Sequence, residues 1–150
     1  MVNFYPAFLS NAWRAWDKAR TDYAKSQGVS ASVYGGKAPA PLVAWDRAHP
    51  EPQATAKDVA DHIDHIVAVA GHDHVGIGGD YDGIPFAPEG LEDVSTYPAL
   101  FTELARRGYS QEDLEKISFR NMMRVMRGVE ATSAAMADVP PYEYPAGGGE

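Results

Sequence analysis

The sequence contains no cysteine. Disulfide bonds, thiolate zinc sites and cysteine nucleophiles are therefore excluded. The absence does not identify a cellular compartment, so the localisation of the protein is left open.

The sequence also lacks a basic stripe and a long hydrophobic run. Its 13 Lys and Arg residues are outnumbered by 21 Asp and Glu, which gives a formal net charge of −8. Binding to nucleic acid depends on cationic side chains that displace counterions from phosphates, and this composition argues against it. No segment is long and apolar enough to cross a bilayer, and the first residues do not resemble a secretory signal. We expect neither a nucleic-acid partner nor a membrane segment in this chain.

The remaining composition suits one globular domain of 150 residues, 45% of them hydrophobic. Two apolar segments, MVNFY at residues 1–5 and His74–Gly79, predict short buried strands. Helical spacing of apolar residues predicts four helices, with capping boxes at Thr55 and Asp58 and at Ser110 and Asp113, and an N-cap at Ser95. These helices lie between Ser10 or Asn11 and Gly28, from about Ala56 to Ala70, between Ser95 and Gly108, and from Ser110 to about Val129.

Two segments are predicted to lack regular structure. Residues 29–53 are rich in Gly, Pro and Ala and predict a long irregular loop, of the kind found in insertions. Residues 131–150 have the Pro and Gly content of a disordered tail. The folded domain is therefore expected over residues 1–130.

The alternation of strands and helices favours parallel strands joined by helical crossovers, an α/β fold. Two parallel strands need neighbours and a cover on both faces. The pattern thus indicates part of a larger α/β domain, with strand edges that could bind a partner or leave the chain a homo-oligomer.

The stretch GIGGDYDG, residues 76–83, places two aspartates where the second apolar strand ends. Asp80 is the candidate functional residue, since a carboxylate at a buried strand end is costly without a cation or hydrogen-bond donors. Asp82 precedes Gly83, a common turn pair, and we assign it to the turn. Gly78 and Gly79 allow close approach of backbone to a neighbour or ligand.

The histidines do not form a recognisable ligand set. His62 and His65 are three residues apart on a predicted helix, a spacing that can bind metal, but no third ligand follows at a recognisable distance. A histidine at the boundary of the core is the favoured interpretation of His62. Asn121 lies on the apolar face of the last predicted helix, where a buried amide would bind loop backbone.

Several segments together resemble the membrane (renal) dipeptidase family: VNFYP, DVADHIDHIVAVAGHDHVGIGGDYDG, PEGLEDVSTYP and RNMMRVMRGVE. The resemblance runs from Met1 to about Glu130. It implies the C-terminal part of a (β/α)8 TIM barrel of the metal-dependent hydrolase type, in an enzyme that hydrolyses dipeptides with water bridging two Zn2+ ions. It further implies that Asp80 faces the metal pair as a catalytic carboxylate without being a metal ligand.

The resemblance also implies that the family's metal ligands lie upstream of VNFYP, so no metal ligand is expected in this chain. We therefore expect a C-terminal fragment that is inactive alone, with Tyr5 and Phe8 as candidate substrate-binding residues. The alternative is a non-catalytic remnant or partner-binding module.

Overall fold

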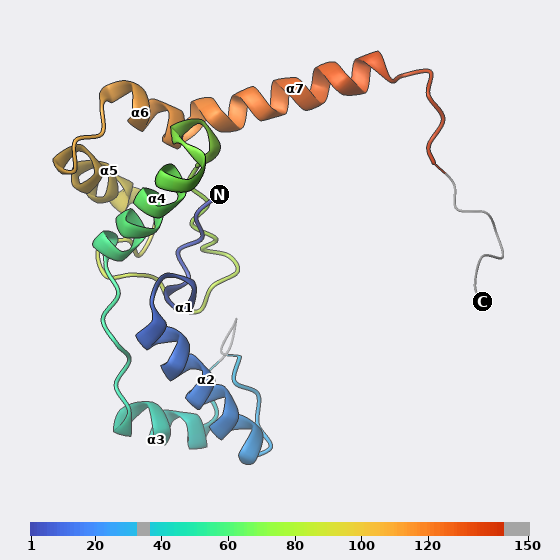
Figure 1. The fold of residues 1–150 in the computed structure, drawn as a ribbon. Helices are drawn as coiled ribbons and strands as arrows, with labels where there is room; N and C mark the ends of the chain where they lie inside the picture. Colours follow the sequence, from blue (N-terminus) through green and yellow to red (C-terminus); the bar gives the residue numbers. More distant parts are fainter. Residues whose placement is uncertain (33–36, 143–150) are drawn as a thin grey trace.

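A computed structural model describes residues 1–32 and 37–142 of the chain. Helices dominate it (Figure 1): α1 (Pro6–Leu9), α2 (Asn11–Ser26), α3 (Ala40–Ala48), α4 (Ala56–Ala70), η1 (His72–His74), η2 (Val94–Thr96), α5 (Tyr97–Arg106), α6 (Gln111–Glu115), the π-helical turn η3 (Lys116–Arg120) and α7 (Asn121–Ala135).

The two predicted strands lie side by side and run parallel. Val2 donates to the carbonyl of Gly76 at 2.7 Å and accepts from the N–H of Gly78 at 3.0 Å, which forms a parallel bridge with Ile77. The expected extent of the strands is wrong: in the described residues the pairing is limited to isolated bridges, this one and another between Thr55 and Glu89. Sheet pairing of such short, glycine-rich segments is weak because glycine adds no side-chain packing.

The core forms where the paired segments meet α4, α5 and η3. Val2 and Phe4 from the first segment pack with Val75 from the second, and all three are buried. The helices contribute Val59, Ala60, Ile63, Leu100, Leu104 and Ile117. Burial of each large aliphatic side chain contributes about 1.5–3 kcal/mol, so this cluster fixes the positions of the two segments.

The predicted capping boxes are confirmed. Thr55 and Asp58 begin α4, and Ser110 and Asp113 begin α6, each pair with both reciprocal hydrogen bonds. The predicted cap at Ser95 is wrong, because the side chain of Asp93 accepts from the N–H of Ser95 and caps η2 instead.

The expectation of irregular structure over 29–53 is wrong where α3 forms. Arg20 of α2 is buried and donates to both carboxylate oxygens of Asp46, at 2.8 and 3.1 Å. Trp16 donates from Nε1 to the carbonyl of His49 at 2.8 Å. These contacts hold α3 against α2. The residues that make them lie far apart in the sequence, so the composition of residues 29–53 does not reveal them. Residues 33–36 of the predicted loop lie outside the described residues.

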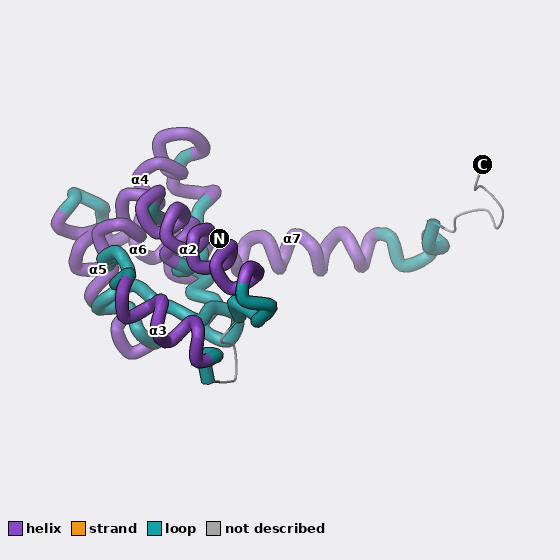
Figure 2. Tube along the Cα trace, turned by 90° about the horizontal axis from the view of Figure 1, so that it is seen from below, coloured by secondary structure: helices purple, strands orange, loops and turns teal. Residues whose placement is uncertain are grey.

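The predicted role of Asn121 is confirmed. Its buried amide donates to the carbonyls of His72 and Val75, at 2.7 and 2.8 Å, and so fixes the start of α7 to the backbone before the second strand. Helix α7 continues past the predicted end at Val129 to Ala135 and extends away from the other helices (Figures 1 and 2). Residues 131–135 of the predicted tail are therefore helical, while 143–150 lie outside the described residues.

Candidate functional site

The backbone of Asp80 has a left-handed conformation, with φ of 61°. This conformation is uncommon for residues other than glycine, although aspartate tolerates it better than most. A turn follows at once, closed by the N–H of Gly83 donating to the carbonyl of Asp80 at 2.8 Å. The predicted turn is confirmed, and it directs the Asp80 side chain away from the core at the end of the second strand.

Asn3 of the first strand holds the Asp80 carboxylate. Its Nδ2 donates to Oδ2 of Asp80 at 2.7 Å, and its Oδ1 accepts from the backbone N–H of Tyr5 at 2.7 Å. The second bond fixes the orientation of the amide, because only Nδ2 can then face the carboxylate. The parallel pairing of Val2 and Ile77 brings the two residues together, since carboxyl ends of parallel strands meet at one edge.

One expectation about Asp80 needs correction. We expected a carboxylate at a buried strand end, where it would need a cation or hydrogen-bond donors; the Asp80 side chain is instead exposed, and Asn3 is its donor. The buried residue at the strand end is Gly79, and the left-handed turn after it moves Asp80 outward.

At two positions beside Asp80, neighbouring atoms lie so close to the backbone that only glycine fits. A Cβ on Gly83 would lie 2.4 Å from Oδ1 of Asp80, so the carboxylate packs directly on that backbone. A Cβ on Gly79 would lie 2.9 Å from the ring of Tyr81 and 2.9 Å from the hydroxyl of Tyr97. The predicted close approach at Gly79 is therefore confirmed. Asp82 lies in the predicted turn, and it is exposed.

Tyr5 and Phe8 lie together just beyond the first strand, with ring centroids 5.3 Å apart in an edge-to-face arrangement. The Tyr5 hydroxyl donates to Oδ1 of Asp17 in α2 at 2.8 Å. Burial, together with this hydrogen bond, raises the pKa of the Tyr5 hydroxyl above its ordinary value. The Tyr5 hydroxyl is therefore engaged with Asp17, and the Phe8 ring beside it is exposed.

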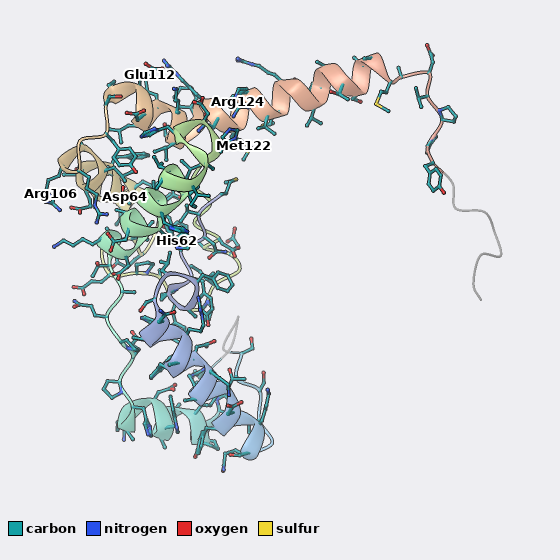
Figure 3. All side chains as sticks on the ribbon, viewed as in Figure 1. His62, Asp64, Arg106, Glu112, Met122 and Arg124 are labelled. Atoms are coloured by element: carbon teal, nitrogen blue, oxygen red, sulfur yellow. The ribbon has the colours of Figure 1, made fainter. Side chains whose placement is uncertain are left out.

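The described part of the chain does not provide a zinc site. Within it, no three His, Asp or Glu side chains are grouped so that they could hold a metal ion. On α4, His62 is half-buried and His65 is exposed (Figure 3 labels His62). His72 instead packs edge-to-face on Tyr109, with ring centroids 5.4 Å apart.

Sequence reasoning missed Asn3, and it assigned Gly83 only to the turn. The signal for Asn3 was a polar residue between Val2 and Phe4, which are both buried. Successive side chains of a strand point to opposite faces, so the side chain of residue 3 points away from the core that buries Val2 and Phe4.

Residues 1–139 match the family model described as "Membrane dipeptidase (Peptidase family M19)". The chain belongs to the membrane dipeptidase family. An uncharacterised dipeptidase of Schizosaccharomyces pombe is 38% identical over 145 residues, which cover 96% of this chain and 26% of that protein. Human Dipeptidase 3 is 53% identical over 77 residues, or 51% of this chain and 16% of that protein.

The fold of this family member agrees with a solved structure. The probable dipeptidase PvdM from Pseudomonas aeruginosa superposes with a TM-score of 0.58 at 24% identity, over 81% of this chain and 34% of that one. The predicted fold class is confirmed: the chain has the architecture of part of a (β/α)8 barrel. It spans about a quarter or less of the curated relatives named above.

Proposed function

We propose that residues 1–139 supply the Asp80 side of the active site of a metal-dependent dipeptidase. Membership of the membrane dipeptidase family and the placement of Asp80 support this proposal. In (β/α)8 barrels, catalytic side chains project from the carboxyl ends of the strands. Asp80 follows the second of two parallel strands at that end, and Asn3 from the first strand holds its carboxylate.

Asp80 would act as a proton acceptor or as the partner of the dipeptide's ammonium group. Its Oδ2 is occupied by Asn3, and Oδ1 packs against Gly83. Both contacts restrict the rotation of the carboxylate, which is the preorganisation that proton transfer and substrate positioning require. Tyr5 and Phe8 would form an aromatic wall for the substrate on the same side of the strand pair.

The two zinc ions that the family resemblance implies would need ligands from outside the described residues. About three quarters of the S. pombe relative lies outside the matched region, since the match covers 26% of it. The chain alone is accordingly proposed to be inactive. Zinc-dependent hydrolysis of a glycine dipeptide by the purified 150-residue chain would overturn this part of the proposal.

The role of Asp80 can be tested in a chimera that joins the part of the S. pombe relative outside the match to residues 1–139. We expect Asp80→Asn to lower kcat by about a hundredfold or more, because proton transfer by a positioned group contributes about 10²–10⁴-fold, and to leave zinc content unchanged. Asp82→Asn is the matched control and should keep kcat within about twofold. Loss of zinc from Asp80→Asn would make Asp80 a metal ligand instead, and unchanged kcat would exclude it from the reaction.

A further inference from the structure

Helix α7 has one apolar face that the described residues leave uncovered. Met122, Val125, Met126, Val129 and Met136 have exposed fractions between 39% and 64%. At about 100° per residue these five side chains share a sector of about 100° around the helix axis. We call them the α7 apolar stripe.

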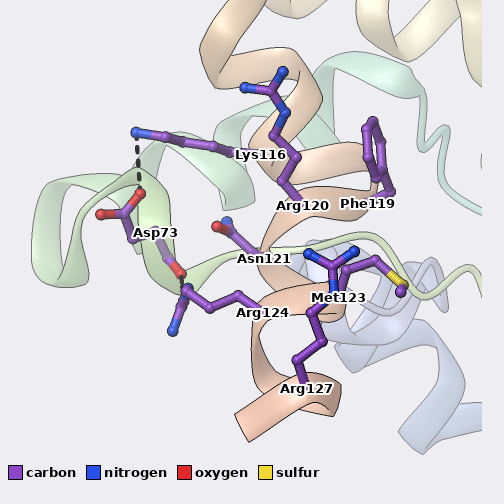
Figure 4. A pocket seen from close by; sticks show the side chains of 8 residues that line it. All are labelled: Asp73, Lys116, Phe119, Arg120, Asn121, Met123, Arg124 and Arg127. Carbon is purple, nitrogen blue, oxygen red and sulfur yellow. Dashed lines mark hydrogen bonds and ion pairs between the residues drawn. The ribbon is translucent and has the colours of Figure 1, made fainter.

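The opposite face of α7 is basic and makes its own contacts (Figure 4). On it, Arg124 donates to the carbonyl of Asp73 at 2.6 Å, and Lys116, one turn before α7, pairs with the Asp73 carboxylate at 3.1 Å. The helix is therefore amphipathic, with charged residues on one side and the stripe on the other. An isolated helix of about 15 residues is marginally stable in water, so a helix with this pattern is expected to be stabilised by a covered stripe.

The position of α7 indicates what covers the stripe. Asn121 binds the carbonyls of His72 and Val75, so α7 begins at the amino-terminal end of the second strand. A groove of about 240 Å³ separates Met122 and Val125 from Met1 and Gly76, at the amino-terminal ends of both strands. The stripe thus reaches the amino-terminal end of the strand pair.

The length of the stripe fits several further strands. From Met122 to Met136 it runs about 21 Å, equivalent to about four neighbouring strands spaced about 4.8 Å apart. In the described residues, the strand pair is formed only by the Val2–Ile77 bridge, which leaves both outer edges without a neighbour. The match to the S. pombe relative covers 96% of this chain, so it includes residues of α7. About three quarters of that relative lies outside the match.

We propose that the α7 apolar stripe is the docking surface for the amino-terminal ends of the remaining barrel strands of a membrane dipeptidase. The helix lies across that end of the barrel and closes it, with the basic face toward solvent. This surface is distant in the fold from Asp80, which follows the carboxyl end of its strand, and the proposal does not depend on dipeptide hydrolysis.

The test is co-expression of the tagged 150-residue chain with the part of the S. pombe relative outside the match, supplied as a separate polypeptide. We expect the wild-type chain to recover this polypeptide as a one-to-one complex. The triple variant Val125→Gln, Met126→Gln, Val129→Gln should reduce recovery at least tenfold. The matched control, Arg127→Gln, Ala131→Gln, Ala134→Gln on the opposite face, should stay within twofold. Glutamine is a good helix former, and circular dichroism of both variants should show unchanged helix content.

Three outcomes would overturn the proposal. The first is failure of the wild-type chain to recover the polypeptide. The second is equal recovery by the stripe variant and the control. The third is a homodimer of the wild-type chain that excludes the polypeptide and that the stripe variant dissociates, which would assign the stripe to a second copy.

Discussion

Asn3 Nδ2 lies 2.7 Å from Asp80 Oδ2, although the two residues are 77 positions apart in the sequence. The contact joins the ends of two parallel strands, and the N–H of Tyr5 fixes the amide that makes it. An amide that cannot flip holds a carboxylate in one rotamer. Asn3 is therefore a positioning residue for Asp80 under the proposed function.

We predict that Asn3→Ala in the chimera lowers kcat by about tenfold to a hundredfold, since a hydrogen bond to a charged group contributes about 1.5–3 kcal/mol. Asn3→Asp should lower it further, because a second carboxylate would repel Asp80. Zinc content should stay unchanged in both variants. Full kcat in Asn3→Ala together with a loss in Asp80→Asn would reject positioning by Asn3 and retain the role of Asp80.

Gly83 provides a second test of how the carboxylate is placed. In Gly83→Ala the new methyl group would lie 2.4 Å from Asp80 Oδ1, so the carboxylate must move. We expect at least a tenfold loss of kcat in the chimera, because a misplacement of about 1 Å can cost about 10²-fold. Gly128→Ala in α7 is the control, since nothing lies within 4 Å of its new methyl group. Equal activity of the two variants would contradict the packing of Asp80 on Gly83.

Local features of this fold were predictable from the sequence, and long-range features were not. The capping boxes at Thr55 and Ser110 depend on residues three positions apart. The buried amide of Asn121 was visible because a polar residue interrupts an apolar face. By contrast, α3 is held by the contact of Arg20 with Asp46, and composition alone predicted a loop there.

In the candidate site, too, local features were predictable from the sequence and long-range contacts were not. Asp80 was found from its place at a strand end and from the family resemblance. Its exposure, its left-handed backbone and its contact with Asn3 depend on how the two strands are paired. The pattern predicted parallel strands but not the register, and register decides which side chains meet.

Asn121 should contribute measurably to stability. Asn121→Ala would leave the carbonyls of His72 and Val75 without their donor in a buried setting, at a cost of about 1–3 kcal/mol. Asn121→Asp should be at least as destabilising, because a carboxylate cannot donate and repels carbonyl oxygens. Urea unfolding of the 150-residue chain measures both, and Ser133→Ala on the exposed part of α7 is the control. Wild-type midpoints for both Asn121 variants would contradict the role.

Glu103 should make stability depend on acid pH. Its carboxylate accepts from Arg106 Nη2 and Arg107 Nε, each at 2.8 Å, and these bonds lower its pKa from 4.5 to about 2. Because the pKa is lower in the folded state, the folded chain is stabilised above about pH 4.5, and this contribution disappears as the pH falls toward about 2. We expect Glu103→Gln to lower the Tm at neutral pH, with the difference from wild type vanishing near pH 2. Thermal unfolding followed by circular dichroism across this range measures the difference, and Glu130→Gln at an exposed position of α7 is the control for removal of one carboxylate. A Glu103→Gln difference that is constant with pH would show that packing, and not the charge of Glu103, carries the effect.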